Sequence, residues 1–366
     1  MLSMIKFKVF ILVSVSALVS CKSMQTPLVA FDDLDYYASC PNTESLKVDK
    51  LMPSVSYGLI DLRIIDTLCL FMTNDSDKGF IKIGDLSDFS IKRHAVRRGN
   101  GPNELLWYLY FNEISFSHED DTLFAYLRNN KRQISRWNIS ETLSSGKVEF
   151  DTLSRSYLGT MSSIYINDSL TFVTQLNNNE TAIERLLYSN DKVKSIPHLS
   201  KLNAPGVTNS DGYSFNALSM IYSYNKYHEK IVEVGASQNI INIYSLNGDF
   251  KKSICIGELC EYDVNNAKSW PVAYEHLDLN DDFIAALYVD DTRYRYESRE
   301  KTLPSIRILS WEGIPLLELK IDKPATNFEF DFKNQKLYTL NSEDESFIRY
   351  DISQLFQHYP DVFKSR

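Results

Sequence analysis

The stretch "FDFKNQKLYTL", residues 330–340, contains two short apolar strands joined by a polar turn. Aromatic residues and threonine favour strands, and asparagine beside charged residues favours a turn, so the stretch predicts a β-hairpin. The same arrangement occurs five more times, in residues 62–71, 114–127, 164–173, 224–234 and 277–287. Aligned on the turn, neighbouring copies lie 47 to 61 residues apart. A repeat of this length indicates the fold class, because each copy is one structural unit.

Each hairpin is followed by a third strand, and most copies have a fourth. The third strands are expected at residues 80–84, 133–139, 182–188, 240–248, 305–313 and 347–352. The fourth strands are expected at residues 89–96, 147–153, 192–199, 250–257 and 315–321. Four strands repeated six times are typical of a β-propeller, whose blades bury their faces against one another. We therefore predict an all-β fold, a six-bladed β-propeller of four-stranded antiparallel blades.

The sixth repeat has no fourth strand of its own after Ile352. Residues 44–51, "ESLKVDKL", precede the first blade and carry apolar side chains between charged ones. We predict that this N-terminal strand closes the ring as the outer strand of the sixth blade, since closure removes exposed strand edges. The propeller then spans residues 44–356, and residues 357–366 form a C-terminal tail.

The composition is that of a large globular protein with a mixed surface. The chain has 366 residues, of which 43% are hydrophobic and 13% aromatic, enough for a full-sized core in one domain or two. Its formal net charge is −9. This charge argues against general nucleic-acid binding, which needs a basic surface to displace counterions.

The first 21 residues resemble a bacterial lipoprotein signal. An apolar run follows two lysines and ends in Leu-Val-Ser-Cys at residues 18–21. The resemblance implies cleavage of residues 1–20, acylation of Cys21 and a lipidated tether over residues 21–43, which makes a membrane one partner. A plain secretory signal or a transmembrane anchor is the alternative, but the run is short for a span of about 20 residues. The absence of aspartate after Cys21 implies the outer membrane, and the leaflet stays open.

One loop carries a second resemblance. Residues 99–104, "GNGPNE", follow an expected outer strand, and residues 243–257 read "IYSLNGDFKKSICIG". Over residues 45–355 this is similar to the TolB-like six-bladed propeller lipoproteins of Bacteroidetes and, more distantly, to NHL-repeat propellers with their G-x-G-P-x-[EQ] loop. A second copy at residues 256–262 lacks the Gly-Pro pair. The resemblance implies a propeller in the cell envelope and implies no agreed chemistry.

The residues of that loop also have a plain structural reading. Gly99 and Gly101 allow positive φ and Pro102 fixes its own φ, so the three residues are expected to set the path of the chain. Glu104 is expected to cap neighbouring amides. The loop then serves as the connection from blade one to blade two.

Loops between blades and loops between the second and third strands of a blade share one face of a propeller. On that face the sequence places a candidate binding surface of arginines and tyrosines: Arg97, Arg98, Arg128, Arg132, Arg293, Tyr294 and Tyr296. Arginine beside aromatic rings suits carboxylates and sugar faces. The alternative reading is structural, with solvated or ion-paired arginines and tyrosines that pack against the rim.

The sequence contains no catalytic or metal-binding motif of the usual kinds, so no catalytic residue, metal ligand or cofactor is expected. Acidic turns at residues 74–79 and 341–346 resemble calcium loops only loosely, because they lack the required spacing. Cys69 is expected to be a buried thiol, whereas Cys255 and Cys260 could pair as a disulfide. The absence of a CxxC pair argues against zinc.

These observations favour an envelope lipoprotein whose propeller binds a protein or a glycan without catalysis. A lactonase-like or lyase-like enzyme is the alternative, because catalytic groups that meet in a propeller channel leave no local motif. Three or more carboxylate or histidine side chains converging on the axis would favour the enzyme. A purely structural role in the envelope is the third reading, since the fold alone does not determine function.

Overall fold

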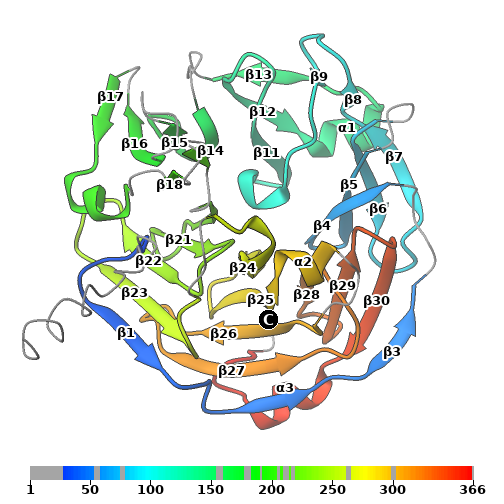
Figure 1. The fold of residues 1–366 in the computed structure, drawn as a ribbon. Coiled ribbons are helices and arrows are strands. Elements are labelled where there is room, and N and C mark those ends of the chain that lie inside the picture. Colours follow the sequence, from blue (N-terminus) through cyan, green and yellow to red (C-terminus); the bar gives the residue numbers. More distant parts are fainter. Residues whose placement is uncertain are drawn as a thin grey trace, which may run out of the picture.

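The structure is a computed structural model, and it forms a six-bladed β-propeller (Figure 1). It describes residues 28–52, 58–74, 79–153, 160–176, 183–189, 192–203, 207–208, 214–215, 219–260, 265–297 and 302–364. Each blade is an antiparallel sheet whose first strand lies nearest the centre of the ring. The predicted fold class is thereby confirmed.

The first three blades follow the predicted repeat closely. Blade one contains β4 (Leu59–Ile65), β5 (Leu68–Thr73), β6 (Ile81–Asp85) and β7 (Ile91–Ala95). Blade two contains β10 (Ser115–Glu119), β11 (Thr122–Arg128), β12 (Ile134–Asn138) and β13 (Phe150–Thr152). Blade three contains β14 (Thr160–Asn167), β15 (Leu170–Leu176), β16 (Ile183–Ser189) and β17 (Lys192–Ser195).

The last three blades draw on the N-terminal segment as well. Blade four contains β20 (Met220–Asn225), β21 (Lys230–Gly235), β22 (Ile241–Ser245) and β23 (Lys251–Ile256). Blade five contains β24 (Pro271–Leu279), β25 (Ile284–Thr292), β26 (Ser305–Leu309) and β27 (Pro315–Lys320). Blade six contains β28 (Asn327–Asp331), β29 (Lys336–Asn341), β30 (Ser346–Asp351) and β3 (Val48–Leu51).

The hairpins form because their turns tolerate a left-handed residue. In the opening stretch, Asp331 pairs with Lys336, and Gln335 between them has φ 54°. Asp66 and Glu229 adopt the same conformation in the turns of blades one and four, at φ 54° and 51°. Along the strands, aromatic and branched side chains pack between neighbouring blades, as Phe328 does against the core shared with blade five. The core therefore lies between the blades rather than on the axis.

The ring is closed by the N-terminal segment, as predicted, although by a shorter strand. β3 pairs antiparallel with β30 of blade six, with Leu51 opposite Ile348. β1 (Leu34–Tyr37) adds to the outer strand of blade four, and β2 (Thr43–Ser45) adds to that of blade five, both in parallel. We name residues 28–51 the N-terminal belt; Figure 1 shows it in blue along the outside of three blades.

The N-terminal belt changes two sequence assignments. The sequence predicts a tether over residues 21–43, but β1 and β2 hold the later part of that segment on the ring. Residues 44 and 45 belong to β2 on blade five and not to the closing strand. The reason is that β23 and β27 leave free outer edges, which the belt covers. Nothing in the local sequence pattern identifies these distant partners.

The described residues contain three α-helices besides the strands. α1 (Ile139–Ser145) lies between the third and fourth strands of blade two, and α2 (Arg293–Glu297) lies in the long loop of blade five. α3 (Ser353–His358) begins before the predicted tail, and Phe363 beyond it is 1% exposed in the core of blades five and six. Residues 357–364 are thus packed against the propeller. None of the helices in the described residues combines the length and apolar character that a membrane span requires.

The cysteines of the described residues are all free thiols. Cys69 is fully buried, as expected. Cys255 and Cys260 are not joined, and burial raises the pKa of Cys255 to about 11. A thiol with so high a pKa is unreactive at neutral pH.

Candidate functional site

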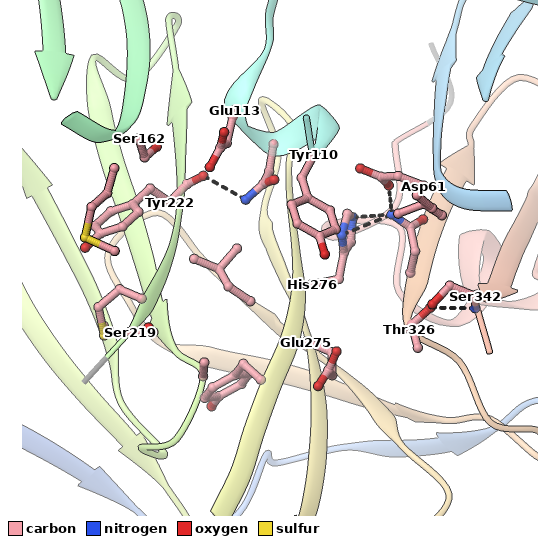
Figure 2. Close-up of a pocket in the computed structure, with 18 of the residues that line it drawn as sticks. Asp61, Tyr110, Glu113, Ser162, Ser219, Tyr222, Glu275, His276, Thr326 and Ser342 are labelled. Carbon is pink, nitrogen blue, oxygen red and sulfur yellow. Dashed lines mark hydrogen bonds between the residues drawn. The ribbon is translucent and has the colours of Figure 1, made fainter. Parts of the chain in front are cut away.

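The strongest candidate site is a cavity of about 390 Å³ at one mouth of the central channel. Its walls come from the first residues of five innermost strands, from the connection before β10, and from α2. We name it the channel-mouth pocket. Figure 2 shows Asp61 and His276 on one side of it and Glu113 and Ser162 on the other, with Tyr110 and Glu275 between them. Ligand pockets commonly measure about 300–1,000 Å³.

One side of the pocket is a buried polar cluster. The Asp61 carboxylate accepts a hydrogen bond from the Phe111 backbone amide at 2.6 Å and another from the Asn327 side-chain amide. The Asn327 amide nitrogen also lies 3.1 Å from His276 Nδ1. Burial raises the pKa of Asp61 to about 6, and burial together with the Arg63 charge lowers the pKa of His276 to about 3. His276 is therefore neutral at physiological pH.

The opposite wall begins with the short helix η1 (Phe111–Glu113), which precedes β10. The Asn112 side chain donates to the Tyr222 backbone carbonyl at 3.2 Å, which ties η1 to blade four. Burial raises the pKa of Glu113, while the Arg128 charge and a hydrogen bond to Ser162 oppose that shift. These two contacts offset the effect of burial only in part, so the pKa of the Glu113 carboxyl group stays above its usual value.

Aromatic rings complete the lining. Tyr110 is 50% exposed and meets Tyr108 edge-to-face, with ring centroids 5.7 Å apart. Tyr296 on α2 also faces the pocket, and burial and the Glu275 charge raise the pKa of its hydroxyl. Among the described residues that line the pocket, none is lysine or arginine. The pocket therefore combines carboxyl groups, amides, hydroxyls and ring faces without a lining cation.

Below the pocket the channel contains an ion-pair cluster. Arg63 lies 2.7 Å from the Asp278 carboxylate and 3.2 Å from that of Glu329. A second cavity, of about 450 Å³, opens at the other mouth, where the innermost strands end. Asn112 lines both cavities, and the rings of Tyr126 and Tyr165 stack at 3.9 Å in the second. We favour the first cavity as the site because the half-exposed Tyr110 ring lines it.

The loop at residues 97–106 joins blade one to blade two but lies away from the pocket. β8 (Arg97–Arg98) pairs in parallel with β9 (Glu104–Leu105), and both arginines are exposed at the outer side of the ring (Figure 1). Glu104 accepts a hydrogen bond from the Gly101 amide at 2.8 Å. Pro102 is exposed.

The two glycines of this loop make room for the Glu104 side chain and do not supply positive φ as expected. Neither Gly99 nor Gly101 has positive φ. Instead, a Cβ atom on Gly99 would lie 2.0 Å from the Glu104 carboxylate, and one on Gly101 would lie 2.9 Å from it. Asn130 of blade two holds the loop by donating to the Gly99 carbonyl at 2.9 Å.

The other residues of the predicted binding surface lie in different places, some at the pocket and some away from it. Tyr296 lines the pocket, and Arg128 lies close enough to Glu113 to lower its pKa. Arg132 is exposed in a turn with φ 58°. Arg293 and Tyr294 are exposed on α2, where Lys268 lies over the Tyr294 ring at 5.6 Å. The arginines of residues 97 and 98 and the tyrosines of α2 do not form one patch.

Several pocket residues carried no local signal in the sequence. Asp61, Glu113 and His276 come from different blades, so their proximity depends on the closed ring. Tyr110 is the exception, because "WYLY" at residues 107–110 places aromatic residues in a connection between blades. Trp107 in that run is 72% exposed.

Only some residues of the metal and lipid predictions lie in the part of the chain that the structure describes. Within the described residues, no group of three or more histidine, cysteine, aspartate or glutamate side chains could hold a metal ion. The loosely calcium-like turn at residues 341–346 forms the hairpin between β29 and β30. Residues 75–78 of the other turn lie outside the described residues, as do the signal and Cys21.

Comparisons with known proteins extend this picture. No protein-family model and no curated protein matches the sequence. Among solved structures, a member of the DUF4221 family from Bacteroides vulgatus has 14% identity and a TM-score of 0.50, covering 83% of this chain and 94% of that one. The likeness is one of fold.

Two further Bacteroides structures are similar at lower scores. An exported protein from Bacteroides fragilis has 9% identity and a TM-score of 0.45, covering 84% of this chain and 99% of its own. An auxiliary nutrient binding protein from Bacteroides thetaiotaomicron has 11% identity and a TM-score of 0.43, covering 80% and 69%. Identities this low extend to no site or activity, and the TolB-like assignment stays a prediction.

Proposed function

We propose that this chain is an outer-membrane lipoprotein, anchored through Cys21, whose propeller binds a glycan in the channel-mouth pocket without catalysis. The anchoring rests on the Leu-Val-Ser-Cys sequence at residues 18–21. The binding role rests on one observation. Ring faces and hydrogen-bonding groups line the same open cavity of about 390 Å³.

Sugars are recognised by this combination of groups. A pyranose presents an apolar face that packs on an aromatic ring, and its hydroxyls bond to carboxylates and amides. The pocket offers the half-exposed Tyr110 ring, Tyr296 on α2, and the Glu275 carboxylate, whose charge acts on the Tyr296 hydroxyl. A ligand stacked on Tyr110 would therefore meet hydrogen-bonding groups on its edges.

The charge of the pocket narrows the class of sugar. Asp61, Glu113 and Glu275 contribute carboxyl groups, and no lining residue in the described part is a lysine or arginine. Like charges in a desolvated site repel, so uronic and sialic acids are disfavoured. Neutral or amine-bearing sugars fit the pocket better.

The test is an affinity measurement with the soluble Cys21→Ser form. Glycan-array screening with neutral, amino and acidic sugars gives the ligand, and calorimetry gives its affinity. Tyr110→Ala is expected to weaken binding about tenfold, because it removes the stacking face. Glu275→Gln is expected to weaken it by a similar factor for an amine-bearing sugar.

Trp107→Ala is the matched control, since Trp107 is an exposed aromatic residue of the same segment that does not line the pocket. Equal losses from Tyr110→Ala and Trp107→Ala would argue against the pocket. The chain could instead bind a protein partner and lose that binding only with Arg97→Glu and Arg98→Glu. That result would show that the ligand is a protein and not a glycan. Chemical conversion of the bound sugar would show that the protein is an enzyme and not a binding module.

A further inference from the structure

The N-terminal belt meets the ring between blades three and four. Val29 and Phe31 are 1% and 5% exposed and belong to the core shared by these blades. The Val29 amide donates to the Gln238 side chain at 3.1 Å, and the Phe31 amide donates to the Ser253 hydroxyl at 2.7 Å. Lys201, which follows the outer strand of blade three, forms an ion pair with Asp32 at 3.0 Å. The chain is therefore fixed at this point.

From this point the belt runs only toward blades four, five and six, through β1, β2 and β3 in turn. Leu28 is accordingly the described residue nearest in sequence to Cys21, seven positions away. Each residue spans at most about 3.6 Å, so the intervening chain reaches at most about 25 Å. An acyl group on Cys21 would hold the boundary of blades three and four close to the bilayer.

The outer strand of blade three at this boundary carries exposed lysines and is not covered by the belt. β17 is the outer strand of blade three, and no belt strand pairs with it. Lys192 and Lys194 on this strand are exposed, and neither has a carboxylate partner among the described residues. Val193 between them is 52% exposed. Lysines attract anionic lipid headgroups, and a nearby apolar side chain can enter the headgroup region.

The neighbouring rim of blade two differs, because its acidic residues are paired with basic ones. Its outer strand β13 carries Asp151, and Glu149 precedes it. Glu149 is paired with Lys147 at 2.5 Å, and Asp151 lies 3.5 Å from Arg136. β17 thus presents two exposed lysines without a carboxylate partner in the described part of the chain, whereas the acidic residues at the outer strand of blade two are paired.

We infer that the β17 rim, residues 192–195, rests on a lipid surface, so that the propeller stands edge-on to the membrane. The inference rests on the proposed anchoring through Cys21. Edge-on placement leaves both mouths of the channel open to the surrounding solution. A soluble glycan could then reach the channel-mouth pocket without leaving the membrane surface.

The test is photocrosslinking of the full-length lipidated chain in vesicles of phosphatidylethanolamine and phosphatidylglycerol. Val193→p-benzoylphenylalanine reports the β17 rim. Leu51→p-benzoylphenylalanine reports the far rim, and Tyr227→p-benzoylphenylalanine reports a hairpin turn at one face; these side chains are 67% and 75% exposed. The yield of lipid adduct at position 193 is expected to exceed the other two at least about tenfold, because headgroup contact is short-ranged.

Charge reversal supplies the second arm. Lys192→Glu with Lys194→Glu is expected to lower the yield at position 193 roughly tenfold. Lys47→Glu with Lys50→Glu, the same change on the far rim, is expected to leave it unchanged. Equal yields at positions 193 and 51, or a dominant yield at 227, would overturn the edge-on placement. Absence of acyl chains on Cys21 by mass spectrometry would overturn the anchoring itself, and the placement with it.

Discussion

Arg185→Ala is expected to lower the free energy of unfolding by about 3–5 kcal/mol. Arg185 lies on β16 of blade three and is 1% exposed. It binds both oxygens of Glu233 on blade four, through Nε at 2.9 Å and Nη2 at 3.0 Å. Loss of the guanidinium would leave a fully buried carboxylate without its countercharge, which is the costly case for a buried ion pair.

Further hydrogen bonds connect the Arg185–Glu233 pair to the rest of the interface between blades three and four. Arg185 Nη1 also donates to the Leu202 carbonyl at 2.5 Å, and Asn242 donates to Glu233 Oε1 at 2.9 Å. The Asn242 side chain in turn donates to the Val29 carbonyl of the N-terminal belt at 2.8 Å. Breaking the pair therefore loosens the point where the belt meets the ring.

Chemical denaturation followed by tyrosine and tryptophan fluorescence measures this loss. The double variant Arg185→Met with Glu233→Leu should recover most of the stability, because it removes both charges together. Lys147→Ala, at an exposed ion pair with Glu149, should cause no measurable change. A loss from Arg185→Ala no larger than that of the exposed control would contradict the expected role.

Asp61 and His276 are expected to give the stability opposite dependences on pH. The folded-state pKa of Asp61 is raised to about 6 from 3.8, mainly by burial, so its contribution to stability falls as pH rises between these values. The folded-state pKa of His276 is lowered to about 3 from 6.5, again mainly by burial, so its contribution rises as pH increases over that range. Between pH 4 and pH 6 the two contributions offset each other.

Single substitutions separate the contributions of Asp61 and His276 to stability. Relative to the parent chain, Asp61→Asn should become more stable by about 2–3 kcal/mol as pH rises from about 4 to about 6. His276→Gln should become less stable by about 2–3 kcal/mol over the same interval. Urea unfolding at several pH values gives these differences. Parallel profiles for the two variants and the parent chain would show that neither group titrates as described.

The repeat could be predicted because its signals are local. A turn residue such as Gln335 and the strands beside it are adjacent in sequence, so each hairpin identifies itself. The closing strand was predicted from a global count, since the sixth repeat lacked one strand. β1 and β2 have no comparable signal, because short parallel strands depend on the free edges of β23 and β27.

The candidate site shows the same division. Tyr296 can be predicted from sequence because it lies in an unusually long loop between two strands. Asp61 and His276 are joined through Asn327, and the three residues come from blades one, five and six. Their proximity is a property of ring closure. A carboxylate in "LIDLRII" at residues 59–65 is unremarkable in sequence, since Asn327 and His276 lie more than 200 positions away.

The N-terminal belt also determines when folding can finish. Asp49 accepts a hydrogen bond from Arg349, and the two residues are 300 positions apart. The first part of the propeller to be synthesised therefore pairs with the last, and contacts of such separation form late. Until then blade six lacks its fourth strand, and its open edge invites pairing with other chains. With the export that we propose, the propeller would stay incomplete until its final blade has crossed the membrane.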